Sequence, residues 1–209
     1  MKLNVVNKEG ADTGRKVTIS KSIFGIEPND HAIYLDAKQY LASQRQGTHK
    51  TKDKSEIMGS TKKLRKQKGS GAARIGSVKS GILRGGGRFH GPRPRDYWFK
   101  LNKKVKNIAR LSALTYKAKE KNITVVEGFD MDAPNTKSFA EVLSNLKVDG
   151  ARTLFVVPSH NKNVYLSSRN LPKAEVLEAA NLNTYSILKA TNLVLVEESV
   201  AKIEETFSK

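Results

Sequence analysis

The sequence contains no cysteine and no long apolar run. Without thiols, disulfide bonds and thiolate metal sites are excluded, which fits a reducing compartment. The longest strongly apolar runs, residues 154–157 and 193–196, are far too short to cross a membrane. The N-terminal stretch turns polar after Val6, unlike a secretory signal. We therefore expect a soluble chain that stays in the cytoplasm and has no membrane partner.

Groups that carry catalysis are also scarce. No set of side chains with the spacing of a metal site or a catalytic triad stands out. Glu127, Asp130 and Asp132 follow a predicted strand, where α/β enzymes often place active sites, but solvation of a loop is the preferred interpretation. We predict no enzymatic activity, no metal site and no cofactor. The four histidines, which show no ligand spacing, are His31, His49, His90 and His160.

Positive charge is present in excess, and almost all of the excess lies in one stretch. The chain carries 38 Lys and Arg against 20 Asp and Glu, a formal net charge of +18. Residues 45–106 hold 19 of the basic residues but only three acids, Asp53, Glu56 and Asp96. The remainder is nearly balanced, with 19 basic and 17 acidic residues. Such a local excess indicates a polyanionic partner, either nucleic acid or an anionic membrane surface.

Residues 45–95 of this stretch are poor in apolar side chains. Ordering about 50 residues costs on the order of 50–100 kcal/mol of backbone entropy. Burying eight apolar side chains returns only about 12–24 kcal/mol, so a partner must order the segment or it stays disordered. A flexible linker is the alternative, but a linker needs no such excess of cations. The larger apolar side chains are Ile57, Met58, Leu64, Ile75, Val78, Ile82, Leu83 and Phe89.

Glycine is concentrated in the same stretch, with 10 of the 15 glycines in residues 45–106. Residues 69–74, GSGAAR, and residues 85–87, GGG, lack the strand-to-helix setting of a nucleotide-binding loop. We therefore predict no nucleotide site. Glycine also lets a backbone approach phosphates and bases closely, and this is the role that we predict here.

Outside the basic stretch, short apolar runs alternate with helical patterns. Because strands that alternate with helices form parallel sheets, we predict an α/β fold with a mostly parallel sheet flanked by helices. A globular body of residues 1–44 and 97–209 is interrupted by a long extended basic loop, residues 45–96. Strands are predicted at residues 3–6, 17–19, 123–126, 153–157, near 176 and at 193–196. Helices are predicted at residues 30–44, from 102 or 103, after Thr136, from about 161, at 183–189 and at the C-terminus.

Cations of the loop and of the helix after it are the candidate nucleic-acid-binding residues. Each can neutralise a phosphate and release a counterion, and arginine adds bidentate contacts and stacking on bases. Tyr97, Trp98 and Phe99 are either platforms for unpaired bases or anchors of the loop on the body, and both interpretations stay open. The candidate cations are Arg45, Lys50, Lys52, Lys62, Lys63, Arg65, Lys66, Lys68, Arg74, Lys79, Arg84, Arg88, Arg93, Arg95, Lys100, Lys103 and Lys104.

Several long motifs, in the same order along the chain, resemble the bacterial large-subunit ribosomal protein L4 family. Residues 45–52, RQGTHKTK, resemble the opening of that family's long loop, and residues 62–71, KKLRKQKGSG, resemble its tip. Residues 84–87 and 91–97 resemble the return limb of the loop, and residues 100–104 and 110–114 the helix that follows. Residues 168–172, 182–185 and 193–195 resemble the C-terminal half. The likeness spans the whole chain.

This resemblance implies a structural constituent of the large ribosomal subunit, in the cytoplasm. Its partners would be 23S rRNA, which the cations above would bind early in assembly, other large-subunit ribosomal proteins, and the nascent peptide in the exit tunnel. Leu64, Ala72 and His90 depart from residues common in the family. A general nucleic-acid-binding protein or an autoregulatory repressor is the alternative. The tunnel tip would comprise Arg65, Gln67, Lys68, Gly69, Ser70 and Gly71.

Overall fold

A computed structural model describes residues 1–207, and the chain divides into two compact units. One unit, here called the body, consists of Met1–Leu41 and the chain from Lys100 onward. The other, Ala42–Phe99, is here called the arm. Among the described residues, no helix combines the length and the apolar character needed to cross a bilayer.

The body is built on a six-stranded sheet with the strand order β2-β1-β3-β6-β4-β5. Within residues 1–207, only β1 and β2 pair in antiparallel fashion, and every other neighbouring pair is parallel. This confirms the predicted α/β fold with a mostly parallel sheet. The strands are β1 (Lys2–Val6), β2 (Asp12–Thr18), β3 (Ile123–Val126), β4 (Thr153–Val157), β5 (Ala174–Glu178) and β6 (Asn192–Val196).

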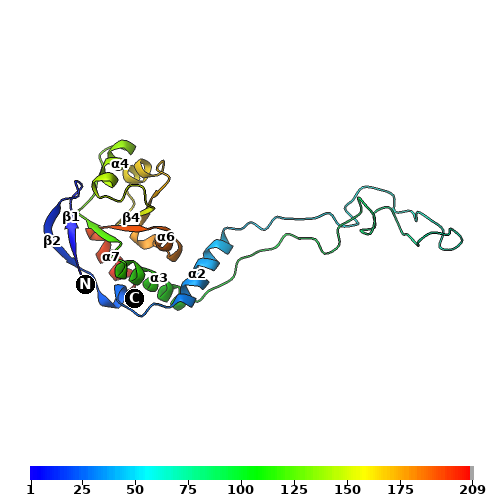
Figure 1. The fold of residues 1–209 in the computed structure, drawn as a ribbon, viewed down its shortest axis with the longest axis horizontal. Helices are drawn as coiled ribbons and strands as arrows, with labels where there is room; N and C mark the ends of the chain where they lie inside the picture. The colour runs from blue at the N-terminus through cyan, green and yellow to red at the C-terminus, as the bar shows by residue number, and fades with distance from the viewer. Residues whose placement is uncertain (208–209) are drawn as a thin grey trace. The chain divides into compact units, whose positions relative to one another are not determined.

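Helices cover both faces of the sheet (Figure 1). In β4, Leu154 and Val156 pack into the core on one face, with α1, α3, α6 and α7. Phe155 and Val157 pack into the core on the other, with α4 and α5. Since both faces are buried, β4 reads as a continuous apolar run. The helices are α1 (Lys21–Phe24), α2 (Asp30–Ser43), α3 (Lys103–Lys119), α4 (Thr136–Asn145), α5 (Lys162–Ser168), the short 3₁₀ helix η1 (Ala179–Asn181), α6 (Thr184–Lys189) and α7 (Glu197–Phe207).

Helix α2 buries a different face from the predicted one. The apolar pattern predicted that Ile33, Ala37, Tyr40 and Leu41 would face the core, but Leu41 is 46% exposed and the other three are half-buried. The buried residues are Ala32, Asp36 and Gln39. Polar and aromatic contacts to α6 explain the rotation, because the Thr184 hydroxyl donates a hydrogen bond to Asp36 and the Tyr40 ring stacks on Tyr185.

Three further details differ from the prediction. Strand β2 begins at Asp12 rather than at residue 17, because it is an exposed edge strand that needs no apolar alternation. Helix α4 is capped by Asn135, whose side chain accepts hydrogen bonds from the backbone of Lys137 and Ser138, so Thr136 is the first helical residue instead of the cap. Helix α1, with Ile23 and Phe24 buried, was not predicted because four residues show no periodicity.

Candidate nucleic-acid interface

The arm has very little regular structure of its own. Residues 44–99 contain no helix or strand. Its outgoing and returning limbs lie side by side (Figure 1), joined by single backbone hydrogen bonds. The amide of Arg95 donates to the carbonyl of Gly47 at 3.1 Å, and farther along the arm the amide of Arg88 donates to Lys52 at 3.0 Å and that of Leu64 to Gly76 at 3.0 Å. These isolated bonds hold the two limbs together at separate points, but they do not form the continuous hydrogen-bond ladder of a β-sheet.

No core forms inside the arm. None of the eight larger apolar side chains of residues 45–95 is buried, and only Ile57, Ile75 and Leu83 among them are even half-buried. Met58 is 96% exposed and Ile82 is 88% exposed. Apolar burial therefore contributes little to holding the arm in shape, as the energetic estimate from the sequence predicted.

The two limbs meet at a cluster of cations around one aromatic ring, here called the neck: Arg45, Gly47, Arg95 and Tyr97. The guanidinium carbons of Arg45 and Arg95 lie 3.7 Å and 4.8 Å from the centre of the Tyr97 ring, within the range of cation–π attraction. A hydrogen bond from Arg95 and the charges of both arginines lower the pKa of Tyr97. Gly47 has φ +66°, and a Cβ there would lie 2.0 Å from the Arg95 carbonyl oxygen.

Two of the three acids of the arm, Asp53 and Glu56, form ion pairs within it. The Arg93 guanidinium of the returning limb donates to Asp53 of the outgoing limb at 2.6 Å. Lys50 forms an ion pair with Glu56, and this contact, together with the backbone amide of Asp53, lowers the pKa of Glu56. These pairs were not predicted from the sequence, although acids this rare in so basic a stretch are a usable signal for ion pairing.

Glycines of the returning limb pack against the arm's own backbone. A Cβ at Gly86 would lie 1.8 Å from the Ser80 carbonyl oxygen, and one at Gly87 would lie 2.4 Å from the Lys54 amide nitrogen. The sequence predicted that these glycines let the backbone approach phosphates and bases closely. In the structure, Gly86 and Gly87 closely approach the backbone of the arm itself. Gly69 and Gly71, near the tip, have φ of +79° and +63° with no atom within 4 Å of an added Cβ, so their surroundings are open.

The candidate cations are almost all exposed. Fourteen of them, from Arg45 to Arg95, lie on the arm, and of these fourteen only Lys79 is half-buried. Within residues 1–207, only Lys50 and Arg93 of the candidate set form an ion pair with an acid. The residues of the predicted tip, Arg65 to Gly71, are exposed as well. Surface cations without an acidic partner are available to an external polyanion.

On the body, the remaining candidate cations lie at the start of α3. Lys100, Lys103 and Lys104 are exposed, and the first turn of α3 contains no acid. The Asn102 side chain makes no capping hydrogen bond. Lysines at a helix N-terminus are unfavourable beside the helix dipole. A phosphate bound there would offset both the dipole and the lysine charges.

The aromatic side chains of the arm differ in exposure. Trp98 is 59% exposed and Phe89 is 57% exposed, whereas Tyr97 and Phe99 are half-buried. With 59% of Trp98 exposed, stacking of its ring on an unpaired base stays a prediction beside the role of an anchor.

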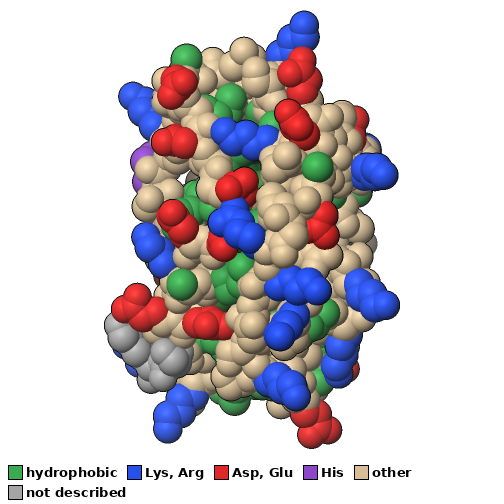
Figure 2. All heavy atoms as spheres, turned by 90° about the vertical axis from the view of Figure 1, so that its left-hand side faces the viewer, with side chains coloured by type: hydrophobic (Ala, Val, Ile, Leu, Met, Phe, Trp, Pro, Cys, Tyr) green, Lys and Arg blue, Asp and Glu red, His purple; other side chains and the backbone are tan. Residues whose placement is uncertain are grey.

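The acids at the strand ends of the body make structural contacts. Glu127 pairs with Arg15 at 2.5 Å. Asp130 accepts hydrogen bonds from the Asn161 side chain at 2.7 Å and from the Met131 amide at 2.9 Å, and these two bonds lower its pKa. No group of three or more potential metal ligands comes together among the described residues. Figure 2 shows basic and acidic side chains interspersed on one face of the body, which carries a smaller excess of positive charge than the arm does.

Comparison with known proteins places these features in a family context. The model of the "Ribosomal protein L4/L1 family" matches residues 17–206. A protein of Parabacteroides distasonis is 62% identical over 207 residues, which cover 99% of each chain. Proteins of Phocaeicola vulgatus and Flavobacterium psychrophilum are 59% and 58% identical, over 100% of each chain. All three relatives are named large ribosomal subunit protein uL4.

Proposed function

Because this chain belongs to the ribosomal protein L4/L1 family, we propose that its arm binds 23S rRNA within the large ribosomal subunit and is ordered by that RNA. Membership makes the chain a structural ribosomal protein and not an enzyme, and its place is the ribosome of the cytoplasm. Its immediate partners would be 23S rRNA and neighbouring large-subunit proteins.

One observation carries the proposal: the arm combines 14 candidate cations, 13 of them exposed, with no buried apolar side chain. Phosphate contacts would supply the free energy that apolar burial does not, through the release of condensed counterions. Where RNA segments converge, the same cations would offset the repulsion between phosphates. Arginine also stacks on bases, which suits a polypeptide that threads between RNA strands.

The tip of the arm would face the nascent peptide in the exit tunnel. Arg65, Gln67 and Lys68 are exposed, as are the glycines on either side of Ser70. Nothing lies within 4 Å of an added Cβ at Gly69 or Gly71, so this segment can lie flat against a wall of RNA. A photo-crosslinking residue placed at Gln67 in assembled ribosomes is expected to capture an arrested nascent peptide. The same residue at Lys137 on the body is the control and should capture none.

The RNA-binding proposal is tested by removing the arm. The full chain and a variant lacking residues 46–96 are titrated with 23S rRNA over a series of salt concentrations. About ten phosphate contacts give a log–log salt slope between about −7 and −9 for the full chain. The variant is expected to lose most of this slope while circular dichroism shows that its body is folded. A nearly flat salt response of the full chain, or equal affinity for duplex DNA, would contradict the proposal.

A further inference from the structure

The sheet of the body has an open edge at β5. This strand is last in the strand order, and no strand within residues 1–207 pairs with its outer side. The Thr153 amide donates to the Lys173 carbonyl at 2.8 Å, so the backbone of Lys173 faces β4. Because alternate residues of a parallel strand turn their backbone groups to opposite sides, Val176 and Glu178 direct theirs away from β4. An unpaired edge of this kind is a template for another strand.

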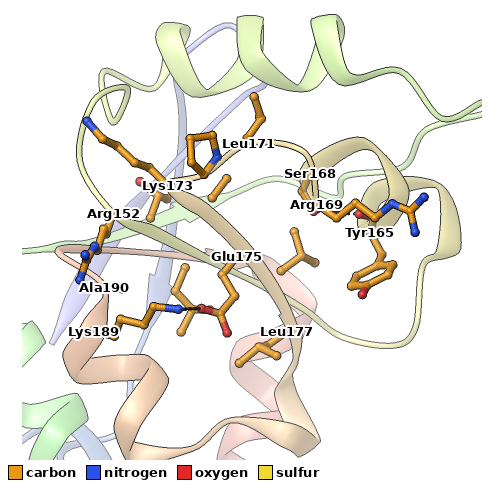
Figure 3. A pocket seen from close by; sticks show the side chains of 15 residues that line it. Arg152, Tyr165, Ser168, Arg169, Leu171, Lys173, Glu175, Leu177, Lys189 and Ala190 are labelled. Atoms are coloured by element: carbon orange, nitrogen blue, oxygen red, sulfur yellow. Dashed lines mark hydrogen bonds and ion pairs between the residues drawn. The ribbon is translucent and has the colours of Figure 1, made fainter.

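A hollow of about 550 Å³ runs along this edge. Its lining comes from both sides of the sheet, with Tyr165 and Arg169 from the end of α5, Glu175 and Leu177 from β5, and Lys189 from the end of α6. Figure 3 shows Arg169 and Tyr165 on one side of the hollow, and Glu175 with Lys189 on another. The edge is therefore accessible and has room for an extended polypeptide.

Charge around the hollow is one-sided. Arg152, Arg169, Lys173 and Lys189 line it, all of them exposed, against the single acid Glu175. That acid is already engaged, since it accepts from Lys189 at 2.9 Å. Arg152 and Arg169 have no acidic partner among the described residues, and Figure 3 shows them on opposite sides of the hollow. The site is thus complementary to an occupant with negative charge toward both ends.

We propose that the β5 edge binds an extended acidic segment of another protein, which joins the sheet as an additional strand. A polypeptide backbone offers amide donors and carbonyl acceptors at the spacing of the open edge. A nucleic-acid backbone offers phosphate acceptors, which the outward carbonyl of Val176 would repel. Acidic side chains beside the strand would pair with Arg152 and Arg169. This inference concerns the body alone and does not depend on what the arm binds.

The test uses the full chain and a library of eight-residue peptides in which acidic residues alternate with β-branched residues. Binding is followed through the backbone amide signals in NMR. We expect acidic members to bind with a Kd below about 1 mM and to shift and protect the outward amides of Val176 and Glu178. N-methylation of alternate amides in the best peptide should weaken binding at least tenfold, since it removes the donors of the added strand.

The matched variants are Arg152→Glu with Arg169→Glu, and, as a control with the same change in charge, Lys137→Glu with Lys202→Glu. Both pairs are exposed, and both leave the basic arm intact. The arginine pair should weaken peptide binding at least tenfold more than the lysine pair. Three results would overturn the proposal: no acidic member binds, signals shift only in the arm, or the N-methylated peptide binds equally well. Tighter binding of a single-stranded RNA octamer through the same two arginines would also overturn it.

Discussion

At the scale of single residues, the pKa of Tyr97 depends on the contacts that hold the neck of the arm together. The Arg95 hydrogen bond and the charges of Arg45 and Arg95 lower its pKa below the ordinary 10.0. The attraction between Tyr97 and the two arginines therefore strengthens as pH rises through the Tyr97 pKa, because a negatively charged phenolate is attracted to a guanidinium more strongly than the neutral phenol is. In an ultraviolet titration, we expect Tyr97 to ionise below the ordinary tyrosine value, and Arg95→Ala to raise its pKa. An unchanged Tyr97 pKa in the variant would contradict this.

Gly86 tests whether the arm's internal packing matters for binding. In Gly86→Ala, the new Cβ would lie 1.8 Å from the Ser80 carbonyl oxygen, so the returning limb must shift. Strain of about 1–3 kcal/mol corresponds to a loss of roughly 5- to 150-fold in RNA affinity. Gly76→Ala is the control, because a Cβ there meets nothing within 4 Å. Equal RNA affinities of the two variants would show that this packing is irrelevant to binding.

In the body, the Asp36 carboxylate accepts a hydrogen bond from the Thr184 hydroxyl. Asp36 is 7% exposed and Thr184 is 1% exposed. Thr184→Val removes that donor and leaves a buried carboxylate with one partner fewer, at a cost of about 1–3 kcal/mol. Thr184→Ser keeps the hydroxyl and should cost less. Chemical denaturation measures both, and equal losses would mean that the hydrogen bond contributes nothing.

At the scale of elements, the N-cap of α4 is Asn135 in the structure, whereas the sequence pattern favoured Thr136. Asn135→Ala should destabilise the protein by about 1 kcal/mol, because its side chain accepts from two orphan amides. Thr136→Ala, at the position that the sequence favoured as the cap, should stay within about 0.5 kcal/mol. Thermal unfolding of the two variants decides between them, and the reverse order would restore Thr136 as the cap.

Buried strands and long amphipathic helices were predictable because burial leaves a pattern in one segment. β3 and β4 have the predicted boundaries. Around α4, the apolar spacing predicts one face with Phe139, Val142, Leu143 and Leu146, and all four pack into one core. The face of α2 was not predictable, because it depends on Thr184 and Tyr185, far along the chain. In the arm, the cations could be named from composition, but the contact of Gly86 with Ser80 could not, since pairing between limbs leaves no local pattern.

At the scale of the whole molecule, the arm is the most exposed target for proteases. Trypsin cleaves after Lys and Arg, and the arm offers many such sites in backbone without helix or strand. We expect cleavage within residues 50–90 before any cleavage in the body. The two fragments should elute together in gel filtration, because β1 pairs with β3 across the cut. First cleavage in the body, or separation of the fragments, would contradict this, and bound rRNA should slow the cleavage.

The pairing of β1 with β3 also sets the order of events during synthesis. β1 ends at Val6, but its parallel partner begins only at Ile123, with the entire arm encoded between them. At about 5–20 residues per second, the N-terminal hairpin, complete at Thr18, waits roughly 5 to 22 s until β3 is complete at Val126. Throughout that interval, the newly synthesised arm is surrounded by cellular RNA before β1 and β3 have paired. Premature, indiscriminate capture of this segment is thus a hazard inherent in the connectivity of the chain.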